Sequence, residues 1–133
     1  MSTSFELRII TQRVQLLNEL VREVTGPGTL GEFGVLPDHI RFLTSLEIGV
    51  LSFKTDRATR KVAVRGGFAE VSDNVMTVLA DDAVAAESVD PVAARDELQT
   101  AESQLGTLSP LDAAYQEADA ARRWAQAKLD ATH

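Results

Sequence analysis

Residues 61–80 have the sequence KVAVRGGFAEVSDNVMTVLA, and this segment decides the fold. Val62 and Val64 alternate with other residues, which is typical of a strand with one buried face. The glycine pair at 66–67 is expected to interrupt that strand, and the Ser-Asp-Asn sequence at 72–74 is expected to turn the chain into another strand over residues 75–80. The segment therefore predicts strands joined by tight turns.

The residues before this segment repeat its pattern. Further strands are expected over residues 5–10, 14–17, 20–24 and 48–54. The sequence Gly26-Pro27-Gly28 is expected to break the chain, and the polar residues 56–59 are expected to form a hairpin turn. Short strands at this spacing predict an antiparallel all-β sandwich or barrel, and the absence of a strand–helix alternation disfavours a parallel sheet.

The composition changes near residue 87. Residues 1–86 contain seven of the eight glycines and all five phenylalanines, whereas residues 87–133 contain one glycine and have alanine at about one position in four. Glycine favours turns and alanine favours helices. The sequence therefore predicts two domains, a β-sandwich domain over residues 1–86 and a helical hairpin domain over residues 87–133.

Two helices are expected in the second domain. Asp90 and Pro91 are a typical helix cap and first helical residue, and Gly106 is expected to end that helix. Ser109 and Asp112 have the spacing of a capping box for a second helix, which leaves a loop of about three or four residues. The inner stripes of the hairpin are Ala94, Leu98, Ala101 and Leu105 in the first helix, and Leu111, Ala114, Ala118, Ala121 and Ala125 in the second.

Alanine dominates these stripes, so the hairpin has little apolar area to bury. At ~25 cal/mol per Å² of buried apolar surface, such packing is weak. Tertiary contacts supply most of the stability of helices in proteins. The hairpin is therefore expected to be the less stable part of the chain and able to detach from the sandwich; an ordinary hairpin packed permanently on the sandwich is the alternative.

Composition excludes several classes of protein. The chain has 133 residues and is 44% hydrophobic, which is enough for a packed core without disulfides or metals, and it has no cysteine. The net charge of −7 opposes binding to nucleic acids and anionic lipids. No apolar run approaches the ~20 residues of a membrane span, and no secretory signal is visible. A cytoplasmic protein is expected, held at any membrane only by a partner.

Motifs for catalysis are scarce. His39 has only the adjacent Asp38 as an acidic neighbour in the sequence, which is unsuitable spacing for a metal site, and no segment resembles a nucleophile elbow. The glycine-rich segment 26–31 lacks both the Lys-Ser/Thr ending and the following helix of a phosphate loop. The carboxylates of Asp81 and Asp82 are expected in a solvated loop. The sequence therefore predicts a protein that is not an enzyme and that needs no cofactor or metal.

The most conspicuous motif is GEFGVLPDH at residues 31–39. Its two glycines and its proline predict a tight surface loop that leads back into an apolar strand. Two other blocks accompany it, GGFAEV at 66–71 and NVMTVLA at 74–80. With these three blocks in order and at the right spacing, the chain resembles, over nearly its whole length, the epsilon subunit of bacterial F-type ATP synthase, whose mitochondrial counterpart is called delta.

The resemblance implies a fold and a function. It implies a sandwich of about ten antiparallel strands followed by a C-terminal α-helical hairpin, in a non-catalytic subunit at the foot of the central stalk. The subunit would bind the gamma subunit and the c-ring, and so help to couple proton translocation to ATP synthesis. By analogy with the family, Glu32 and Phe33 would contact the c-ring, and His39 and Val35 would contact gamma. The expected location is the cytoplasmic face of the bacterial plasma membrane, peripheral through the complex.

The family also implies roles for the hairpin. In some members it unfolds from the sandwich, meets the alpha and beta subunits transiently through basic residues, and inhibits ATP hydrolysis. The corresponding residues here are Arg122, Arg123 and Lys128. Residues 87–133 carry four basic and nine acidic residues, a net charge of −5, so repulsion from an acidic partner predicts only weak inhibition.

Two positions depart from the family pattern. Asp38 stands where glycine is usual, and aspartate tolerates left-handed backbone better than most residues. Ala93 stands where the nucleotide-binding members have an arginine, which removes the strongest phosphate-pairing group. Asp90 and Arg122 remain as nucleotide-binding candidates, but ATP binding is not expected.

Three other functions stay open from the sequence. The chain has the layout of an interaction subunit that belongs to a different assembly. A small hydrolase would use His39 and Asp38. A stand-alone ATP-binding regulator would use the segment around Asp90.

Overall fold

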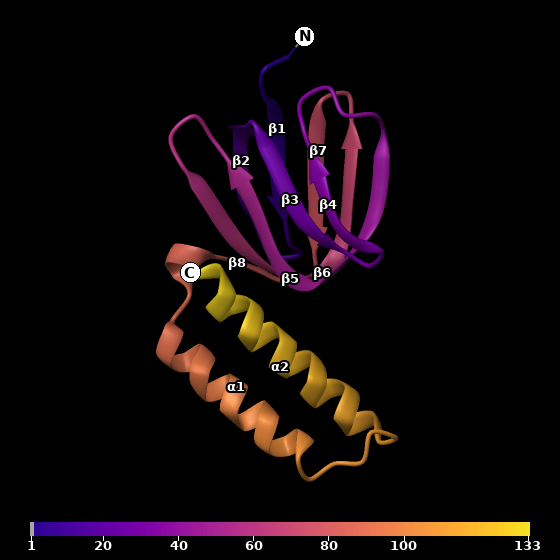
Figure 1. Ribbon diagram of the computed structural model, residues 1–133, viewed down its shortest axis with the longest axis vertical. Coiled ribbons are helices and arrows are strands. Elements are labelled where there is room, and N and C mark those ends of the chain that lie inside the picture. Colours follow the sequence, from indigo (N-terminus) through magenta and orange to yellow (C-terminus); the bar gives the residue numbers. More distant parts are fainter. Residues whose placement is uncertain (1) are drawn as a thin grey trace.

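The computed structural model describes residues 2–133, which form a β-sandwich with a helical hairpin beneath it (Figure 1). The strands are β1 (Phe5–Ile10), β2 (Gln15–Val21), β3 (Glu23–Gly28), β4 (Gly31–Val35), β5 (Phe42–Lys54), β6 (Thr59–Ser72), β7 (Val75–Ala80) and β8 (Ala83–Ala85). A 3-10 turn, η1 (Ala86–Ser88), leads to helices α1 (Pro91–Leu105) and α2 (Ala113–Ala131). The predicted all-β sandwich followed by a helical hairpin is therefore confirmed.

The strands form one sheet that folds over on itself. Their order is β2-β1-β7-β6-β5-β3-β4, and β8 pairs separately with β6. All pairings are antiparallel except that of β1 with β7, which is parallel. The N-terminal strand thus lies between β2 and a strand formed some seventy positions later, from Val75 onward.

Two long strands explain why eight strands are present in residues 2–133 where about ten were expected. The glycine pair in β6 does not end the strand but bends it, because Gly66 and Gly67 have φ angles of 73° and 119°. A Cβ atom on Gly67 would lie 2.0 Å from the Leu79 carbonyl oxygen, so only glycine fits there. The first part of β6 pairs with β8 and the second with β7, so one strand serves where two were expected.

Two other boundary predictions are wrong. Gly26-Pro27-Gly28 does not break the chain but forms the last residues of β3, where β4 pairs with all three, while the pairing with β5 is irregular between Thr25 and Gly28. The strands expected over residues 14–17 and 20–24 are replaced by β2 and β3. The reason is the pairing of β2 with β1, in continuous register from Leu17 to Val21.

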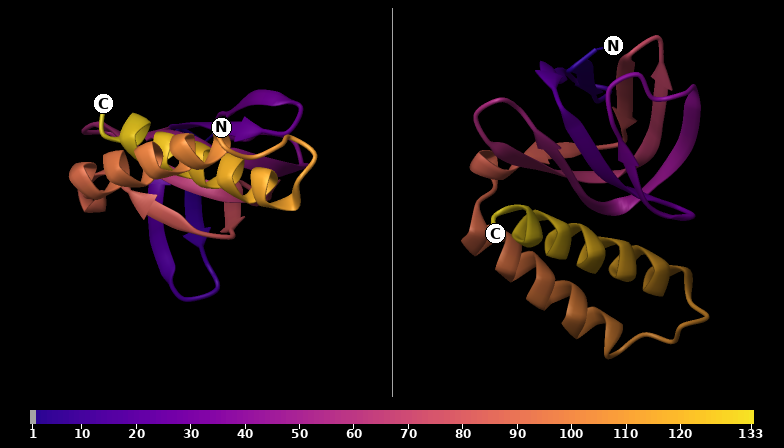
Figure 2. Two further views of the ribbon diagram at one scale, coloured as in Figure 1. Left: turned by 90° about the horizontal axis from the view of Figure 1, so that it is seen from below. Right: turned by 45° about the horizontal axis from the view of Figure 1, so that its top comes forward.

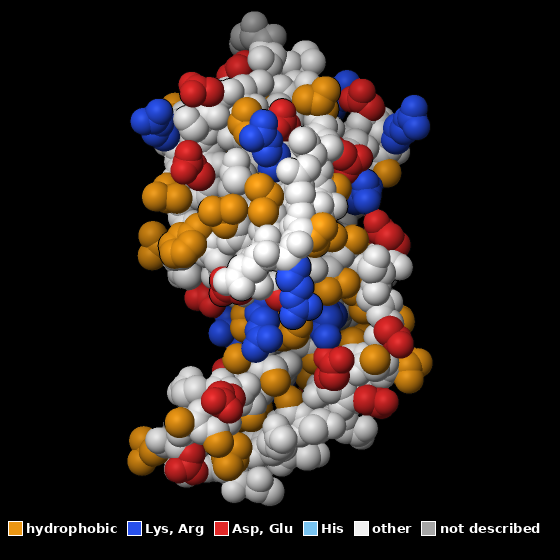
Figure 3. Space-filling view, turned by 180° about the vertical axis from the view of Figure 1, so that it is seen from behind, with side chains coloured by type: hydrophobic (Ala, Val, Ile, Leu, Met, Phe, Trp, Pro, Cys, Tyr) orange, Lys and Arg blue, Asp and Glu red, His pale blue; other side chains and the backbone are white. Residues whose placement is uncertain are grey.

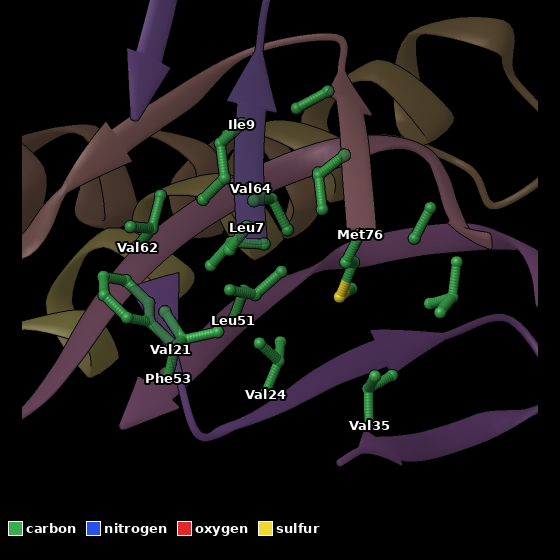
Figure 4. Packing of buried hydrophobic residues seen from close by; sticks show 14 of the residues in the cluster. Leu7, Ile9, Val21, Val24, Val35, Leu51, Phe53, Val62, Val64 and Met76 are labelled. Carbon is green, nitrogen blue, oxygen red and sulfur yellow. The ribbon is translucent and has the colours of Figure 1, made fainter. Parts of the chain in front are cut away.

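The core lies between the two layers of the folded sheet (Figure 4). Phe5, Leu7 and Ile9 of β1 all point inward and are buried, as their alternation predicted. Buried side chains from β3, β5, β6 and β7 meet them, so each strand contributes one face. No charged or polar residue is buried among residues 2–133. The core of the sandwich is purely apolar.

The first helix of the hairpin begins as predicted. Asp90 Oδ1 accepts hydrogen bonds from the backbone amides of Val92 (3.1 Å) and Ala93 (3.2 Å), which is a standard N-cap. Pro91 then occupies the first helical position.

The second helix begins later than predicted, at Ala113. Ser109 and Asp112 make only half of the predicted capping box: Asp112 Oδ2 accepts a hydrogen bond from the amide of Ser109 (3.3 Å), but Ser109 Oγ accepts one from the amide of Leu111 (3.3 Å) rather than from that of Asp112. These side chains stabilise a turn that competes with helix. The connection between the helices therefore runs from Gly106 to Asp112, and Leu111 is 95% exposed rather than part of an inner stripe.

The hairpin meets the sandwich mainly through α2, while α1 packs on α2 (Figure 2). The contact is a small apolar cluster around Ala63 of β6, in which Trp124 and Ala127 take part. Ala118 and Ala125 are buried as predicted, but Ala114 and Ala121 are exposed. Neither helix is long and apolar enough to cross a membrane, in the part of the chain that the structure describes.

Candidate functional site

The loop that carries the 31–39 motif is a β3–β4 hairpin followed by a turn. Glu32 is exposed on β4, and Phe33 is half-buried with its ring against Gly26 and Gly28 of β3. The Phe33 ring lies 5.5 Å from that of Phe42, centroid to centroid. Val35 is fully buried in the core. The expectation that Val35 contacts gamma is therefore wrong for this conformation, because the side chain supports the strand from inside and has no surface to offer.

His39 extends the same aromatic row. Its ring stands edge-on to Phe42, with centroids 5.7 Å apart, and its Nδ1 is 2.7 Å from the Ile40 carbonyl oxygen. The turn before it is closed by the His39 amide, which donates to the Leu36 carbonyl at 3.2 Å. Phe33, Phe42 and His39 thus form a continuous row. The structure brings the residue expected at the c-ring and the residue expected at gamma to either side of Phe42, which the sequence did not single out as a site residue.

The structure shows how Asp38 is accommodated at a position where the family usually has glycine. Its backbone is left-handed, with φ of 63°, and its Oδ2 accepts a hydrogen bond from the amide of Ser2 at 2.8 Å. The amide of Asp38 donates to Asn74 Oδ1 at 2.8 Å, and Asn74 Nδ2 donates to the Ser4 carbonyl at 2.9 Å. The β6–β7 turn therefore holds both the N-terminal segment and the 31–39 motif. The carboxylate of Asp38 is directed to Ser2, so it does not form an acid–base pair with His39.

A strip of exposed apolar side chains crosses the outer face of the sheet. Leu79 of β7 is 53% exposed and lies beside Ile10 of β1 on one side and Phe68 of β6, 57% exposed, on the other. Leu43 of β5, 67% exposed, lies on the same face, diagonal to Phe68. We call these four residues the apolar strip. Hydrophobic side chains gather on the flank of the sandwich in Figure 3, and such clusters typically mark interaction surfaces.

The strip was missed in the sequence, although a signal for it exists. In GGFAEV, Phe68 and Ala69 point to opposite faces, and Ala69 is the buried one. A large aromatic residue at an outward position next to a small inward residue is unfavourable in water. That placement adds a large apolar side chain to the outer face of the sheet.

Residues for chemistry do not converge. Within residues 2–133, no three His, Cys, Asp or Glu side chains lie close enough to hold a metal ion. Every buried side-chain nitrogen or oxygen in the same range has a hydrogen-bond partner.

The basic residues of α2 are all engaged within the chain. Arg122 forms an ion pair with Asp119 at 2.8 Å, Arg123 with Glu47 of β5 at 2.7 Å, and Lys128 with Glu97 of α1 at 2.5 Å. Lys128 also lies over the ring of Trp124, 5.4 Å from its centroid. Figure 3 shows basic side chains gathered where the hairpin meets the sandwich.

The two nucleotide-binding candidates are likewise engaged. The Asp90 carboxylate caps α1, and the Arg122 guanidinium binds Asp119 through two nitrogens. Ala93, which stands where the nucleotide-binding members of the family have an arginine, is half-buried on α1 and offers no cationic group. In this conformation neither polar candidate is directed at a common ligand.

Sequence comparisons give the same family as the motifs. The family described as "ATP synthase, Delta/Epsilon chain, beta-sandwich domain" matches residues 4–86. An ATP synthase epsilon chain from Nitratidesulfovibrio vulgaris (strain DP4) is 48% identical over 108 residues, which cover 81% of each chain. Another, from Geotalea daltonii, is 40% identical over 121 residues, covering 91% of this chain and 88% of the relative.

Solved structures agree at the level of the fold. A chain in the cryo-EM structure of the Euglena gracilis mitochondrial ATP synthase, OSCP/F1/c-ring in rotational state 1, superposes with a TM-score of 0.84 at 25% identity and covers all of this chain and 84% of its own length. A chain in the central stalk/c-ring structure of the Tetrahymena thermophila mitochondrial ATP synthase gives a TM-score of 0.63 at 17% identity, covering 96% of both chains. The family model and the relatives together show that the chain belongs to the delta/epsilon family of ATP synthase subunits.

Proposed function

We propose that this chain is a rotor subunit of the central stalk, which links the gamma subunit to the c-ring and helps to couple proton translocation to ATP synthesis. The observation that carries this proposal is the presence of two surface features on one sandwich, namely the row Phe33–Phe42–His39 and the apolar strip. A part that transmits torque needs a stiff body with broad contacts and no bond-making residues. The purely apolar core and the continuous sheet supply that stiffness.

The c-ring contact is assigned to Glu32 and Phe33. Glu32 is exposed at the β3–β4 hairpin and is available to polar loops of a ring, while Phe33 is anchored on two glycines. A rigid aromatic anchor beside a charged rim residue is a common arrangement in protein interfaces.

The gamma contact is assigned to His39 together with the apolar strip. His39 is held by Phe42 and the Ile40 carbonyl, so its orientation is fixed before any partner binds. The strip offers the apolar area that a lasting interface requires. This assignment replaces Val35, which is buried.

The hairpin is assigned a weak inhibitory role toward ATP hydrolysis through Arg122, Arg123 and Lys128. Each must leave an acidic partner within the chain before it can reach the alpha and beta subunits. The net charge of −5 over residues 87–133 also opposes docking on an acidic surface. Both effects favour weak inhibition.

The proposed location is the cytoplasmic face of the bacterial plasma membrane, where the complex holds the chain. ATP is not a ligand in this proposal, since the motif arginine is replaced by Ala93. An interaction subunit of another assembly is the second candidate, favoured by the same surfaces if gamma is not their partner.

Affinity capture tests the assignment. The tagged full-length chain is expressed in its host, membranes are solubilised with detergent, and the bound proteins are identified by mass spectrometry. Recovery of gamma with alpha, beta and the c subunit is expected. Recovery of the chain alone, or with a different complex, while the synthase stays intact would overturn the rotor assignment.

A matched pair of variants tests the surface itself. Phe68→Asp places a charge in the apolar strip and is expected to reduce recovery of gamma at least about tenfold, as loss of an interface anchor does. Leu20→Asp, on exposed β2 outside the strip, is the control and should leave recovery unchanged. Equal recovery with both variants would contradict the strip as the gamma surface.

A further inference from the structure

Arg60 joins three parts of the molecule that are not neighbours in the sheet. It lies near the start of β6, and its guanidinium stands over the ring of Phe53, 5.5 Å from the centroid. Nη1 donates to Glu19 Oε2 at 2.7 Å, and Nη2 donates to Glu87 Oε1 at 2.9 Å. One planar fork thus binds two carboxylates while its face rests on a buried aromatic ring.

The two carboxylates belong to segments with different roles. Glu19 lies on β2, which ends the sheet order and forms no ladder with β6. Glu87 lies in η1, the short connection that leads from the sandwich to α1. Arg60 therefore closes the sandwich between β2 and β6 and at the same time fastens the start of the hairpin connection to that closed edge.

Few other contacts hold the hairpin in place. Helix α1 packs on α2, and α2 meets β5 and β6 through an apolar cluster of Trp124 and alanines, with Ile48, Val50 and Val84 packed against it. Two polar contacts cross between the strands and the hairpin in the described residues 2–133: the ion pair of Arg123 with Glu47, and the hydrogen bond that Lys61 Nζ donates to the His133 carbonyl at 2.7 Å. With so little apolar area buried, an additional charged contact at the connection weighs heavily in the balance between a docked and an undocked hairpin.

We propose that Arg60 is the positioning residue that clasps the hairpin connection to the sandwich, through Glu87, and so sets the fraction of molecules in which the hairpin is docked. The fork matters more than the charge. Arginine binds two carboxylates and stacks on a ring at once, whereas lysine offers one point charge. The clasp is a property of the isolated chain and does not depend on the rotor contacts proposed above.

The chain carries its own reporter for the test. Trp124 is its single tryptophan and is 8% exposed at the contact between hairpin and sandwich. Acrylamide quenching of its fluorescence therefore follows undocking directly. Amide hydrogen exchange in α1 and α2, compared with exchange in β1 and β7, separates hairpin opening from unfolding of the sandwich.

The variants are made in the full-length chain and compared at low salt. Loss of an ion-pair network with partly exposed groups predicts that Arg60→Met raises the opening constant of the hairpin roughly 2- to 10-fold. Arg60→Lys is expected to recover only part of the protection. Glu87→Ala removes only the contact between Arg60 and the hairpin connection and leaves Arg60 with Glu19 and Phe53. It is expected to produce most of the increase in the opening constant that Arg60→Met produces.

Controls decide the outcome. Arg22→Met breaks the exposed pair of Arg22 with Asp56, which includes neither Arg60 nor Glu87, and should leave Trp124 quenching unchanged. If Arg60→Met destabilises the sandwich, so that β1 and β7 also lose protection, Glu87→Ala still tests the clasp. Unchanged quenching and unchanged α1 and α2 exchange in Glu87→Ala would overturn it, as would full rescue by Arg60→Lys.

Discussion

The ring of Phe33 lies against the backbone of Gly26, so close that a Cβ atom on that glycine would stand 2.7 Å from Phe33 Cζ. The absence of a side chain at position 26 is thus what lets the ring lie flat on β3 and reach Phe42. The glycine-rich segment at residues 26–28, which was expected to break the chain, is the part of β3 on which the Phe33 ring packs.

Replacing Gly26 with alanine is expected to displace the Phe33 ring. Forcing a methyl group into this contact should lower the free energy of unfolding by about 1–3 kcal/mol, as overpacking does. Urea unfolding followed by circular dichroism measures it. Gly34→Ala is the matched control, since a Cβ atom there would have the Val24 carbonyl oxygen, 4.0 Å away, as its nearest atom apart from the two adjacent residues, and its effect should stay within about 0.5 kcal/mol. If both substitutions lower the free energy of unfolding equally, the predicted overpacking between position 26 and the Phe33 ring is wrong.

Removing the side chain of Asn74 is expected to loosen the 31–39 motif. The side chain accepts from the Asp38 amide and donates to the Ser4 carbonyl, and its own φ is 63°. Asn74→Ala should therefore cost about 1–3 kcal/mol in unfolding free energy and raise amide exchange at residues 36–39. Asn74→Gly relieves the backbone strain but, like alanine, lacks the two side-chain hydrogen bonds. If it lowers the free energy of unfolding as much as Asn74→Ala does, the cost comes from the lost hydrogen bonds.

Acid is expected to loosen the hairpin before the sandwich unfolds. The carboxyl of Glu87 has a pKa lowered from 4.5, first by a hydrogen bond from its own backbone amide and then by Arg60. A group whose folded pKa is depressed contributes stability above its unfolded pKa, and this contribution is lost as the pH falls through the folded value. The groups facing it are Arg60 and, through Arg60, Glu19. Trp124 quenching should thus begin to rise below about pH 4.5, and the rise should be absent in Glu87→Gln.

Deleting residues 88–133 is expected to raise ATP hydrolysis by the assembled complex less than severalfold. The reason is the acidic hairpin and the internal pairing of Arg122, Arg123 and Lys128. Steady-state ATPase assays of the purified complex, with and without the deletion, give the answer. A rise of tenfold or more would mean that the hairpin is a strong inhibitor despite its charge.

Titration of the chain with ATP is expected to give no measurable heat at millimolar nucleotide, because Ala93 supplies no guanidinium for a phosphate. Isothermal calorimetry is the measurement. The informative counterpart is Ala93→Arg, which restores the missing group in its helical position. Heat from the unmodified chain would show that Asp90 or Arg122 suffices.

Sequence patterns were enough for the layout of the fold because that layout rests on local chemistry. Alternation placed the inward residues of β1 and β6, and the Asp90–Pro91 pair placed the start of α1. Boundaries that depend on partner strands could not be found this way. The extent of β2 is set by its register with β1, and the continuity of β6 through two glycines is set by β7 on its other side.

The candidate site was predicted unevenly for a similar reason. Glu32, Phe33 and His39 followed from a motif, and the structure places the Phe33 and His39 rings on either side of Phe42, with Glu32 exposed on β4. The apolar strip combines residues from four strands, so no single stretch of sequence contains it. Trp124 takes part in the contact with the sandwich, and of the expected alanine stripe Ala118 and Ala125 are buried whereas Ala114 and Ala121 are exposed.

The parallel pairing of β1 with β7 has a consequence for the order in which the chain folds. β1 is among the first residues to leave the ribosome, yet one of its two edges stays unpaired until β7 has been made. Contacts of such long sequence separation form slowly, and exposed strand edges promote association between nascent chains. We therefore expect synthesis to proceed with an open sheet, which closes only once residues near Ala80 have emerged; the hairpin then folds last, against a sandwich that already exists.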